Sequence, residues 1–551
     1  MDVLVHDLTA DDSYNIADDL RTLLNPFFTV QLVSESTLAS HSWTKTCALL
    51  ILRSSRKSEN PVILPPKAIE EIQSFVYTGG AMLTFGLSVM TSNARPEVNE
   101  LHLWDANLSK FAVLLHNSDI ATPNATTFSV GKLVNGGPDL DPPFAAHILK
   151  GSLTSLGLLD ESLPAQKANL PPVPRHPLPQ FLLSSPRNTQ VTQTILQSIG
   201  ASEALTSSFT LHDAADAFIF TSCTPADSPQ LVNTRRELAP PSDAPAFKEV
   251  LVLPPGSHPP HEATPRFDVE RFFAELGSCS SASGWRMGDA LFYGEAVSST
   301  QTMLDKNPKL LTSLPTPVVS LASHQLAGRG RGANTWLSPE GCLQFSLLLR
   351  LSLSKVPAQR LVFVQYLFGL AVAKACKDER ALGGDRGASV RLKWPNDIYL
   401  DLDSGKKKIG GILVNTSFTG GQVEVIIGCG VNVSTPAPMA SLSLLSPDAQ
   451  LSSETMLALI LSKFESMWET FVESRGSWAP FEDAYLDAWM HSDQSVTVAT
   501  VSPPQQVRIL GITADHGLLR TLPERGAGEF IDLQPDGNSF DLMEGLIRAK
   551  K

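Results

Sequence analysis

Cysteine is scarce in this 551-residue chain, which holds six of them, none in a Cys-x-x-Cys pair or at metal-ligand spacing. We therefore expect free thiols in a reducing compartment, with neither disulfides nor a structural zinc site. Long apolar runs are also missing, because the most apolar stretch, 361–373, contains Gln365 and is too short to span a bilayer. Asp2 and Asp7 stand where a basic leader would be, which predicts no targeting signal and a cytoplasmic protein without a membrane segment.

An excess of positive charge is the second absence. The formal net charge is −13 at pH 7, whereas nucleic-acid-binding proteins normally carry a basic surface. Nucleic acid is therefore not an expected partner, although a local basic pocket for a nucleotide is compatible with this balance. A hydrophobic content of 42% and a charged content of 18% are typical of globular cores, and the length suggests about three or four domains.

Strand and helix patterns alternate in the first part of the chain. Alternation of this kind predicts an α/β domain with a parallel sheet between helices. Short apolar segments predict the strands, and apolar residues at helical spacing predict the helices. The predicted strands are 3–5, 29–33, 47–52 and 81–85, and the predicted helices are 16–24 and 69–76.

Two proline-rich stretches, 170–186 and 224–265, divide the middle of the chain, and the second contains ten prolines. Because proline removes amide donors and fixes φ, we expect no regular structure to continue through either stretch. We interpret the second stretch as a linker into the C-terminal half. After it, Asp268 can cap a helix with an apolar face at 269–276.

Short alternating segments return near the C-terminus, at 496–498, 507–509 and 518–520, with turn residues between them. This pattern predicts a small β-barrel.

Four short motifs follow one another in the second half of the chain. They are 328–336 (Gly-Arg-Gly-Arg-Gly-Ala-Asn-Thr-Trp), 393–397 (Lys-Trp-Pro-Asn-Asp), 408–413 (Lys-Ile-Gly-Gly-Ile-Leu) and 428–433 (Gly-Cys-Gly-Val-Asn-Val). The alternation of Gly and Arg in the first motif is unfavourable within a helix or strand, because glycine loses much backbone entropy there. It predicts a loop whose amides and guanidinium groups close over a phosphate. Together the motifs supply cations, a carboxylate and backbone amides for an anionic ligand.

In this order the four motifs resemble those of biotin protein ligases, called holocarboxylase synthetases in eukaryotes. The segment 297–301 (Val-Ser-Ser-Thr-Gln) is similar to the family's biotin-pocket motif. Gln325 stands three residues before Gly328, as the family's pocket glutamine does. The segment 534–541 resembles the C-terminal domain of the eukaryotic members, so the likeness extends from about Phe267 to the C-terminus.

The resemblance implies an ATP-dependent ligase that makes biotinyl-5′-AMP from biotin and ATP and then transfers biotin to a specific lysine of a carboxylase. Its cofactors would be ATP, biotin and Mg²⁺. Its partners would be the biotin carboxyl carrier domains of acetyl-CoA carboxylase and pyruvate carboxylase type enzymes. A carboxylate is a poor electrophile, so its activation by ATP requires a site that holds two anions together and neutralises charge on the α-phosphate.

The resemblance also implies a multidomain α/β and α+β architecture. Residues 1–222 would form a glutamine-amidotransferase-like α/β domain of the kind found in fungal-type members, and 223–265 a Pro-rich linker. Residues 266–490 would form a catalytic domain similar to class II aminoacyl-tRNA synthetases, and 491–551 an SH3-like β-barrel.

The amidotransferase-like domain lacks a nucleophile at the expected turn. A cysteine would follow the strand 81–85, but Gly86 stands there. The nearby Ser88 lacks the Gly-x-Ser-x-Gly frame that exposes a serine nucleophile. We expect no amidotransferase chemistry, because nucleophilic catalysis needs a nucleophile.

The resemblance assigns site residues in three groups. The catalytic group is Arg331, Lys393, Lys408 and Asp397, with Asp397 also the candidate Mg²⁺ ligand. The biotin-binding group is Ser299, Thr300, Gln325, Gly328, Arg329, Arg331, Lys408, Gly411 and Gly428. The ATP-binding group is Arg331, Asn334, Trp336, Lys393, Asn396, Asp397 and Asn432.

Several alternatives stay open. Arg329 can be a solvated charge, the pair Asn396–Asp397 an ordinary turn, and Trp336 a core residue. A lipoate ligase shares the fold, although the segments 393–397 and 534–541 disfavour it. A third hypothesis is a non-catalytic scaffold that recruits partners through its N-terminal domain.

Overall fold

The computed structural model of the chain divides into two compact units. Unit 1 comprises residues 1–173, 332–339 and 437–439, and unit 2 comprises 174–331, 340–436 and 440–551. The structure describes residues 2–7, 29–39, 43–44, 47–53, 64–77, 81–85, 125–127, 132–136, 170–171, 176–237, 247–279, 284–331, 335–336, 338–436, 439–447, 451–500, 503–525, 529–535, 538–541 and 546–549.

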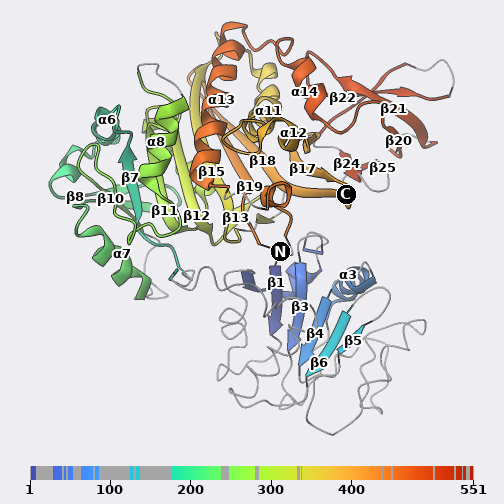
Figure 1. Ribbon diagram of the computed structural model, residues 1–551, viewed down its shortest axis with the longest axis horizontal. Coiled ribbons are helices and arrows are strands. Elements are labelled where there is room, and N and C mark those ends of the chain that lie inside the picture. The colour runs from blue at the N-terminus through green and yellow to red at the C-terminus, as the bar shows by residue number, and fades with distance from the viewer. Residues whose placement is uncertain are drawn as a thin grey trace. The chain divides into compact units, whose positions relative to one another are not determined.

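Unit 1 contains a six-stranded sheet in the order β2-β1-β3-β4-β6-β5, drawn in blue to cyan in Figure 1. Its pairings are parallel except for β5 with β6, which confirms the predicted parallel sheet. The apolar face of α3 packs in one cluster with core residues such as Leu4 and Leu50. The elements are β1 (Asp2–Asp7), β2 (Thr29–Leu32), α2 (Glu35–Leu38), β3 (Cys47–Arg53), α3 (Pro66–Tyr77), β4 (Ala81–Phe85), β5 (Ala125–Thr127) and β6 (Lys132–Gly136).

The four strands predicted for this unit and its helix at 69–76 are confirmed by these bounds. The helix predicted at 16–24 lies outside the described residues, as do Gly86 and Ser88.

Unit 2 is built on an eleven-stranded mixed sheet in the order β16-β17-β18-β19-β15-β12-β11-β7-β10-β9-β8. The strands from β16 to β12 are paired antiparallel, β12 and β11 are parallel, and β7, β10 and β9 are parallel to one another. The strands are β7 (Gln180–Ser184), β8 (Ser208–His212), β9 (Ala217–Ser222), β10 (Phe247–Val252), β11 (Ala290–Val297), β12 (Val318–Gln325), β15 (Cys342–Ser352), β16 (Val390–Lys393), β17 (Asp397–Leu402), β18 (Gly405–Thr419) and β19 (Gln422–Asn432).

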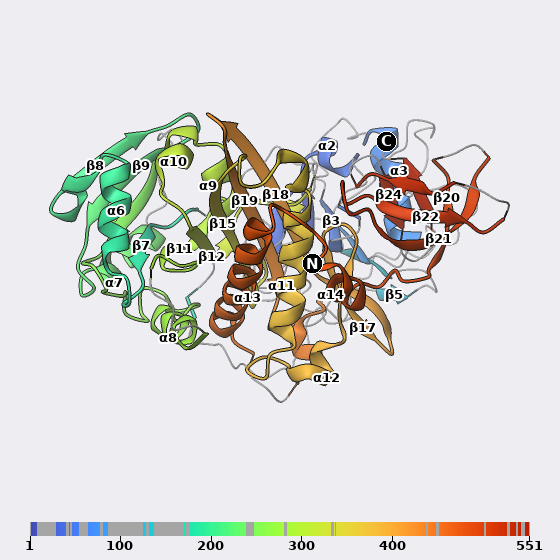
Figure 2. The same cartoon turned by 90° about the horizontal axis from the view of Figure 1, so that it is seen from above.

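Helices cover this sheet. The helices α8, α11 and α13 form one layer, visible in front of the sheet in Figure 2. The predicted helix after the second proline-rich stretch is α8, and the Asp268 carboxylate accepts a hydrogen bond from Arg271 N (2.9 Å), which confirms the predicted cap. The helices are α6 (Gln190–Ser198), α7 (Ser228–Glu237), α8 (Val269–Cys279), α9 (Thr300–Asp305), α10 (Pro308–Ser313), α11 (Phe363–Cys376), α12 (Gly383–Gly387), α13 (Ser453–Glu473) and α14 (Glu482–Ala488).

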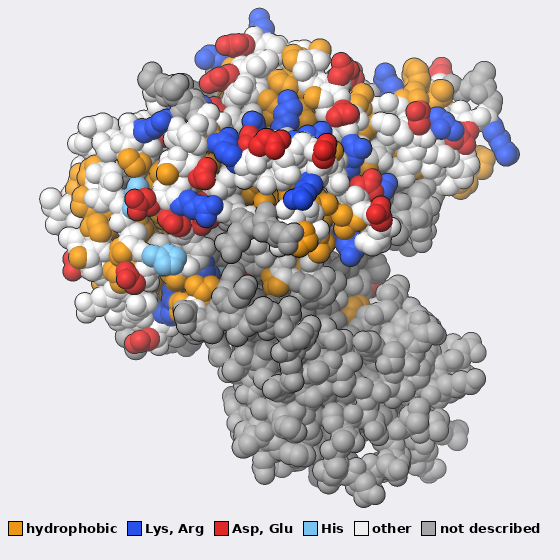
Figure 3. Space-filling view, in the orientation of Figure 1, with side chains coloured by type: hydrophobic (Ala, Val, Ile, Leu, Met, Phe, Trp, Pro, Cys, Tyr) orange, Lys and Arg blue, Asp and Glu red, His pale blue; other side chains and the backbone are white. Residues whose placement is uncertain are grey.

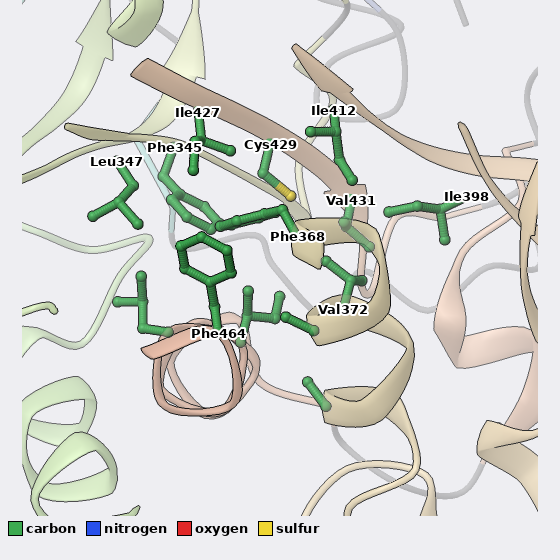
Figure 4. Packing of buried hydrophobic residues seen from close by; sticks show 14 of the residues in the cluster. Phe345, Leu347, Phe368, Val372, Ile398, Ile412, Ile427, Cys429, Val431 and Phe464 are labelled. Carbon is green, nitrogen blue, oxygen red and sulfur yellow. The ribbon is translucent and has the colours of Figure 1, made fainter. Parts of the chain in front are cut away.

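The main core lies between the sheet and the α11–α13 layer. Figure 4 shows Phe345 of β15 facing Phe368 of α11, which in turn faces Phe464 of α13; the ring centroids are 6.0 Å and 4.7 Å apart. Because successive side chains of a strand point to opposite faces, the neighbours of Phe345 in β15, Gln344 and Ser346, are directed to the face away from these helices. Among the described residues, no helix combines the length and apolar character needed to cross a membrane.

The predicted domain boundaries at 222 and 265 differ from this topology. The strands β7 to β10 belong to the large sheet, and β7 pairs antiparallel with β11. The predicted linker 223–265 contains α7 and β10, and the first proline-rich stretch contains β7. The prolines fall where they break no ladder: Pro229 stands in the first turn of α7, and Pro254 follows β10.

The C-terminal part of unit 2 forms a six-stranded sheet in the order β23-β22-β21-β20-β25-β24. It contains the three strands predicted at 496–498, 507–509 and 518–520, which are confirmed. Its strands are β20 (Ser495–Val498), β21 (Gln505–Ile512), β22 (Leu519–Pro523), β23 (Ile531–Leu533), β24 (Asn538–Asp541) and β25 (Leu546–Ala549).

All six cysteines lie among the described residues and all are unpaired, which confirms the prediction of free thiols. On the face of unit 2 shown in Figure 3, basic and acidic side chains are interspersed.

Candidate active site

The Lys-Trp-Pro-Asn-Asp motif forms the turn of a hairpin. The strand β16 ends at Lys393, β17 begins at Asp397, and these two residues are paired across the ladder. Trp394 is buried; its backbone N–H donates to His491 Nε2 (3.1 Å), and its indole Nε1 donates to the Tyr366 hydroxyl (3.0 Å). The buried tryptophan therefore fixes the turn, while Lys393 and Asp397 keep partly exposed side chains.

Lys408 lies across the next pair of strands. Its Nζ is 2.7 Å from Asp397 Oδ1, with side-chain exposures of 46% and 20%. An exposed ion pair of this kind contributes little to folding, because water screens it. The lysine is thus held beside the turn but can exchange its carboxylate partner for a ligand anion.

Arg331 from the Gly/Arg motif reaches the same turn. Its Nη1 donates to Asn396 Oδ1 (2.9 Å) and its Nη2 donates to the Pro535 carbonyl (3.1 Å). Asn396 Nδ2 in turn donates to the Ile412 carbonyl (2.8 Å). Together with Lys393 and Lys408, Arg331 completes a group of three cations around the Asn396–Asp397 turn, which we call the cation cluster.

A second group of polar side chains lies around the start of α9. Gln325 Oε1 accepts from the backbone N–H of Thr300 (2.8 Å), and Gln325 Nε2 donates to Gln344 Oε1 (3.0 Å). The Thr300 hydroxyl is 2.9 Å from the Ser346 hydroxyl, which donates to Gln301 Oε1 (2.9 Å). We call these five residues the amide cluster. All are buried, so their hydrogen bonds fix one another's orientation.

Two further predicted residues support the amide cluster. Ser299 caps α9, and its hydroxyl accepts from Thr302 N (3.3 Å). Gly428 of β19 leaves room for a glutamine, because a Cβ at this position would lie 2.6 Å from Gln301 Oε1. Any larger residue at 428 would displace Gln301 from the cluster.

The sheet register connects the two clusters. Asp397 is paired with Gly411, Gly411 with Gly430, and Gly430 with Gln344. Directly opposite residues of antiparallel strands project to the same face, and the two glycines carry no Cβ. This row of residues, which we call the glycine row, spans three strand spacings, roughly 14 Å. No side chain of the row lies between Asp397 and Gln344.

The remaining predicted residues lie as follows. Arg329 Nη1 is 3.0 Å from Asp305 Oδ2 and does not contact the cation cluster, so its prediction as a biotin ligand gains no support from this geometry. Gly328 begins the short strand β13 (Gly328–Arg329). Asn432 Nδ2 donates to the Ala440 carbonyl (3.0 Å), whereas its buried Oδ1 has no hydrogen-bond partner within the described structure.

Two of the predicted ATP residues are not placed against the cations. Asn334 lies outside the described residues. Trp336, in β14 (Thr335–Trp336), belongs to unit 1.

Within the described ranges, no group of three or more His, Cys, Asp or Glu side chains is arranged to hold a metal ion. The lone Asp397 carboxylate suits Mg²⁺ of the kind that takes most of its ligands from substrate phosphates and water.

His491 beneath the turn is a buried neutral base. Burial lowers its pKa to about 4; the hydrogen bond to Gln494 opposes the shift, and the positive charges of Lys393 and Lys406 add to it. Because Trp394 N–H donates to Nε2, the proton sits on Nδ1, which donates to Gln494 Oε1 (2.8 Å). Neutral His491 thus accepts from the backbone of the motif turn.

Two members of the amide cluster, Gln344 and Ser346, were not predicted from the sequence, and Gln301 was part of the biotin-pocket motif 297–301 without a role of its own. Gln344 and Ser346 are the polar positions at a spacing of two within the apolar strand Cys342–Ser352. That spacing places both on one face, a signal that is visible in the sequence.

The chain is similar in sequence to proteins of known families. A family model described as "Biotin/lipoate A/B protein ligase family" matches residues 293–432, and one described as "Biotin-protein ligase, N terminal" matches residues 1–88. A biotin–protein ligase of Schizosaccharomyces pombe is 33% identical over 311 residues, 52% of this chain and 47% of that protein. Biotin–protein ligase 2 of Arabidopsis thaliana is 33% identical over 280 residues, 49% of this chain and 80% of that protein.

Among solved structures, a biotin protein ligase from Aquifex aeolicus in complex with biotin and ATP is similar over 44% of this chain and 94% of that chain. Its sequence identity is 22% and its TM-score 0.35.

The mixed α/β sheet that carries the cation cluster and the amide cluster lies largely within the segment that matches the biotin/lipoate A/B protein ligase model, so the fold is similar to that class of proteins. More specifically, the chain belongs to the biotin–protein ligase family, since the match covers 80% of the Arabidopsis relative at 33% identity. It spans about half the length of the S. pombe relative, 47%.

Proposed function

We propose that this chain is an ATP-dependent biotin–protein ligase. It condenses biotin with ATP to biotinyl-5′-AMP and pyrophosphate and then transfers the biotinyl group to a lysine of a carrier domain. The observation that carries this proposal is that Arg331, Lys393 and Lys408 meet at the Asn396–Asp397 turn, at one end of a glycine row that leads to the amide cluster. A ligand with a polar ring at one end and a carboxylate at the other matches that arrangement.

In the first step, the amide cluster takes the ureido ring of biotin, whose donors and acceptors match amide and hydroxyl groups such as those of Gln325 and Thr300. The carboxylate then points along the glycine row towards Lys408. A carboxylate oxygen bonds to the α-phosphorus as the bond from that phosphorus to the bridging oxygen breaks, and pyrophosphate leaves. Arg331 and Lys393 oppose the charge that develops on the α-phosphoryl oxygens.

The cation cluster must change partners during this step. Lys408 leaves Asp397 for the ligand anions, because the ion pair is half exposed and weak. Asp397 is then available to Mg²⁺, which when bound would neutralise phosphate charge. Arg331 likewise exchanges its contact with Asn396 for a phosphate.

In the second step, the lysine amine of the carrier attacks the acyl carbon of biotinyl-AMP. The new amide bond forms, the amine loses a proton, and AMP leaves with the electrons of the acyl–oxygen bond. The residues that exclude water from the mixed anhydride govern its survival until the carrier arrives. We assign Trp336 to this role, at the adenine.

Asn432 is the proposed adenine contact on the sheet. Its buried Oδ1 has no partner in the described part of the chain, and a buried acceptor without a donor is costly. The exocyclic amino group of adenine would supply that donor.

The partner and the finer folds complete the proposal. A relative from Paracoccus denitrificans is named biotin–[acetyl-CoA-carboxylase] ligase, which supports carboxylase carrier domains as the protein substrate; a pyruvate carboxylase type partner is part of the same proposal. We also propose an amidotransferase-like fold for the N-terminal unit, a synthetase-like fold for the catalytic part and an SH3-like barrel for the C-terminal sheet.

The test is incubation of the full chain with labelled biotin, ATP, Mg²⁺ and a biotin carrier domain, with lipoate in place of biotin as a parallel arm. The proposal predicts ATP-dependent, biotin-selective label on the carrier lysine. Selective transfer of lipoate would identify a lipoate ligase, and the absence of both adenylate and transfer would favour a scaffold.

A further inference from the structure

A lysine outside the matched family segment 293–432 contacts the biotin-pocket motif. Lys248 lies on β10, and its Nζ donates to the Ser298 hydroxyl (2.8 Å). The same Nζ is 3.3 Å from Asp216 Oδ1, and both charged side chains are only 11% exposed. A buried ammonium is costly unless it is paired and hydrogen-bonded, so this one is held by its two partners.

The carboxylate partner is itself fixed. Asp216 Oδ2 accepts from Asn307 Nδ2 (2.7 Å), and Asn307 Oδ1 accepts from the backbone N–H of Ala215 (3.3 Å) and of Asp216 (3.0 Å). Asn307 Nδ2 also donates to the Met303 carbonyl at the end of α9 (3.0 Å). The network therefore ties the loop before β9 to the helix that carries Thr300.

Ser298 is the junction between the amide cluster and the Gly/Arg motif. It immediately precedes Ser299, the cap of α9, and Thr300, which contacts Gln325. Its carbonyl accepts from Ala327 N (2.8 Å), one residue before the Gly/Arg motif begins. A shift of Ser298 would move the start of α9 and the root of that motif together.

A second chain of contacts connects α7 with the amide cluster. Glu295 Oε1 accepts from the Tyr293 hydroxyl (2.6 Å), which accepts from the Ser323 hydroxyl (2.8 Å). The Ser323 carbonyl accepts from Gln344 Nε2 (3.0 Å). Arg236 of α7 lies 3.9 Å from Glu295 Oε2 and is 10% exposed.

We propose that the layer formed by β7 to β10 is part of the biotin-binding apparatus, and that Lys248 is a positioning residue for Ser298 to Thr300. This inference rests on the proposed biotin–protein ligase function. Lys248 does not reach the reacting atoms; it sets the place of the hydroxyl and amide groups that hold biotin. Its loss should impair biotin binding selectively and leave ATP binding nearly unchanged.

The test compares full-length variants for biotin affinity by calorimetry and for the ATP dependence of biotin-driven pyrophosphate exchange. Lys248→Met keeps the length of the side chain and removes its charge and donors. Lost charge-assisted hydrogen bonds of this kind predict a rise in the biotin Kd of roughly tenfold, with the KM for ATP within about twofold of wild type. Lys248→Arg restores a cation and should recover most of the affinity.

Two further variants separate positioning from stability. Lys248→Met combined with Asp216→Asn removes the carboxylate left unpaired by the single change, and should keep the biotin defect while recovering thermal stability. Arg235→Met breaks a more exposed ion pair of the same layer, with Glu249 (Nε to Oε2, 2.8 Å; side chains 54% and 30% exposed), and serves as the control that leaves the biotin Kd unchanged.

Ser298→Ala closes a double-mutant cycle with Lys248→Met. Both changes remove the same contact, between Lys248 and Ser298. The double variant should therefore lose no more biotin affinity than either single variant. A Lys248→Met protein with wild-type biotin affinity, or one that loses biotin and ATP affinity equally, overturns the inference. A wild-type protein that binds no biotin refutes the proposed function instead, so the two failures are distinguishable.

Discussion

Replacing Lys408 with alanine is the sharpest test of the cation cluster. In the resting protein this lysine is paired with Asp397 at 2.7 Å and is 46% exposed. Removing it should therefore cost less than about 1 kcal/mol of folding stability, the usual contribution of an exposed ion pair. The same substitution should strongly impair formation of the adenylate, because it removes a cation that would touch both the carboxylate and the α-phosphate.

The size of the catalytic effect follows from Coulomb's law. Two unit charges about 3 Å apart in a medium of effective dielectric constant 20 attract by roughly 5 kcal/mol. Partial exposure of Lys408 reduces this, and about 3 kcal/mol agrees with the loss of one preorganised electrostatic contact elsewhere. The rate of adenylate formation should then fall by roughly 150-fold, since each 1.4 kcal/mol is a factor of ten. In addition, Asp397 would lose its counter-charge and repel the phosphates.

The assay is biotin-dependent exchange of pyrophosphate into ATP, run beside thermal unfolding. Lys407→Ala is the matched control, because Lys407 is the exposed neighbour on the same strand and points to the opposite face. Asp397→Asn combined with Lys408→Ala removes the repulsion but also the proposed Mg²⁺ ligand, so the double variant should be no more active than Lys408→Ala. Exchange at a near-normal rate in Lys408→Ala would refute the assignment, and so would an equal loss in Lys407→Ala.

Three further predictions concern the amide cluster, the acid response and the domain boundary. Gly428→Ala should weaken biotin binding by roughly 1–3 kcal/mol in titration calorimetry, because its Cβ would lie 2.6 Å from Gln301 Oε1; unchanged affinity would show that the glutamine yields freely. The pKa of His491 is about 4 in the folded protein and 6.5 in the unfolded chain, so the unfolded chain binds the proton at a higher pH. The free energy of unfolding should therefore decrease by up to about 3 kcal/mol as the pH falls from 6.5 to 4. Urea unfolding at pH 7 and 4.5 should show this loss in the wild type and a smaller one in His491→Gln; equal losses would contradict it. Deleting residues 1–173 should leave adenylate formation largely intact, whereas deleting 1–265 should abolish it, because the second deletion removes β7 to β10 from the edge of β11. Pyrophosphate exchange is measured for both truncated chains, and activity in the shorter one would contradict the role proposed for this layer.

The elements that were predictable from the sequence are those with a local signal. Short apolar segments located the strands β1 to β4 of the N-terminal sheet, and apolar residues at helical spacing located α3 and α8. The prediction for the two proline-rich stretches was wrong, because every dense run of prolines was taken to interrupt helices and strands. In the structure, Pro229 sits in the first turn of a helix and Pro254 beyond a strand end, where a missing N–H costs nothing. The pairing of β7 with β11 links segments about a hundred residues apart, and no local pattern encodes it.

The candidate site divides in the same way. The motif residues around Asp397 come from the ends of neighbouring hairpin strands, so their proximity follows from short-range topology. The amide cluster depends on Gln344, a polar position in a largely apolar strand, whose partner Gln325 lies 19 residues earlier at the end of the neighbouring strand β12. Lys248 was invisible because its partner Ser298 is fifty residues further on and meets it only through the shared sheet.

The two ends of the site rest on different parts of unit 2, and this division has a functional consequence. The layer of β7 to β10 supports the amide cluster through the hydrogen bond from Lys248 to Ser298. The C-terminal part supports the cation cluster, because Arg331 donates a hydrogen bond to the Pro535 carbonyl and Trp394 donates one to His491. Disturbing one support should therefore alter the affinity for one substrate before the other. Acid, which charges His491 and removes the acceptor of Trp394 N–H, should act first on the nucleotide end, whereas changes in the β7 to β10 layer act first on biotin. Catalysis needs both ends held at a fixed separation, and the paired strands β18 and β19, which carry the glycines between the two ends, set that separation.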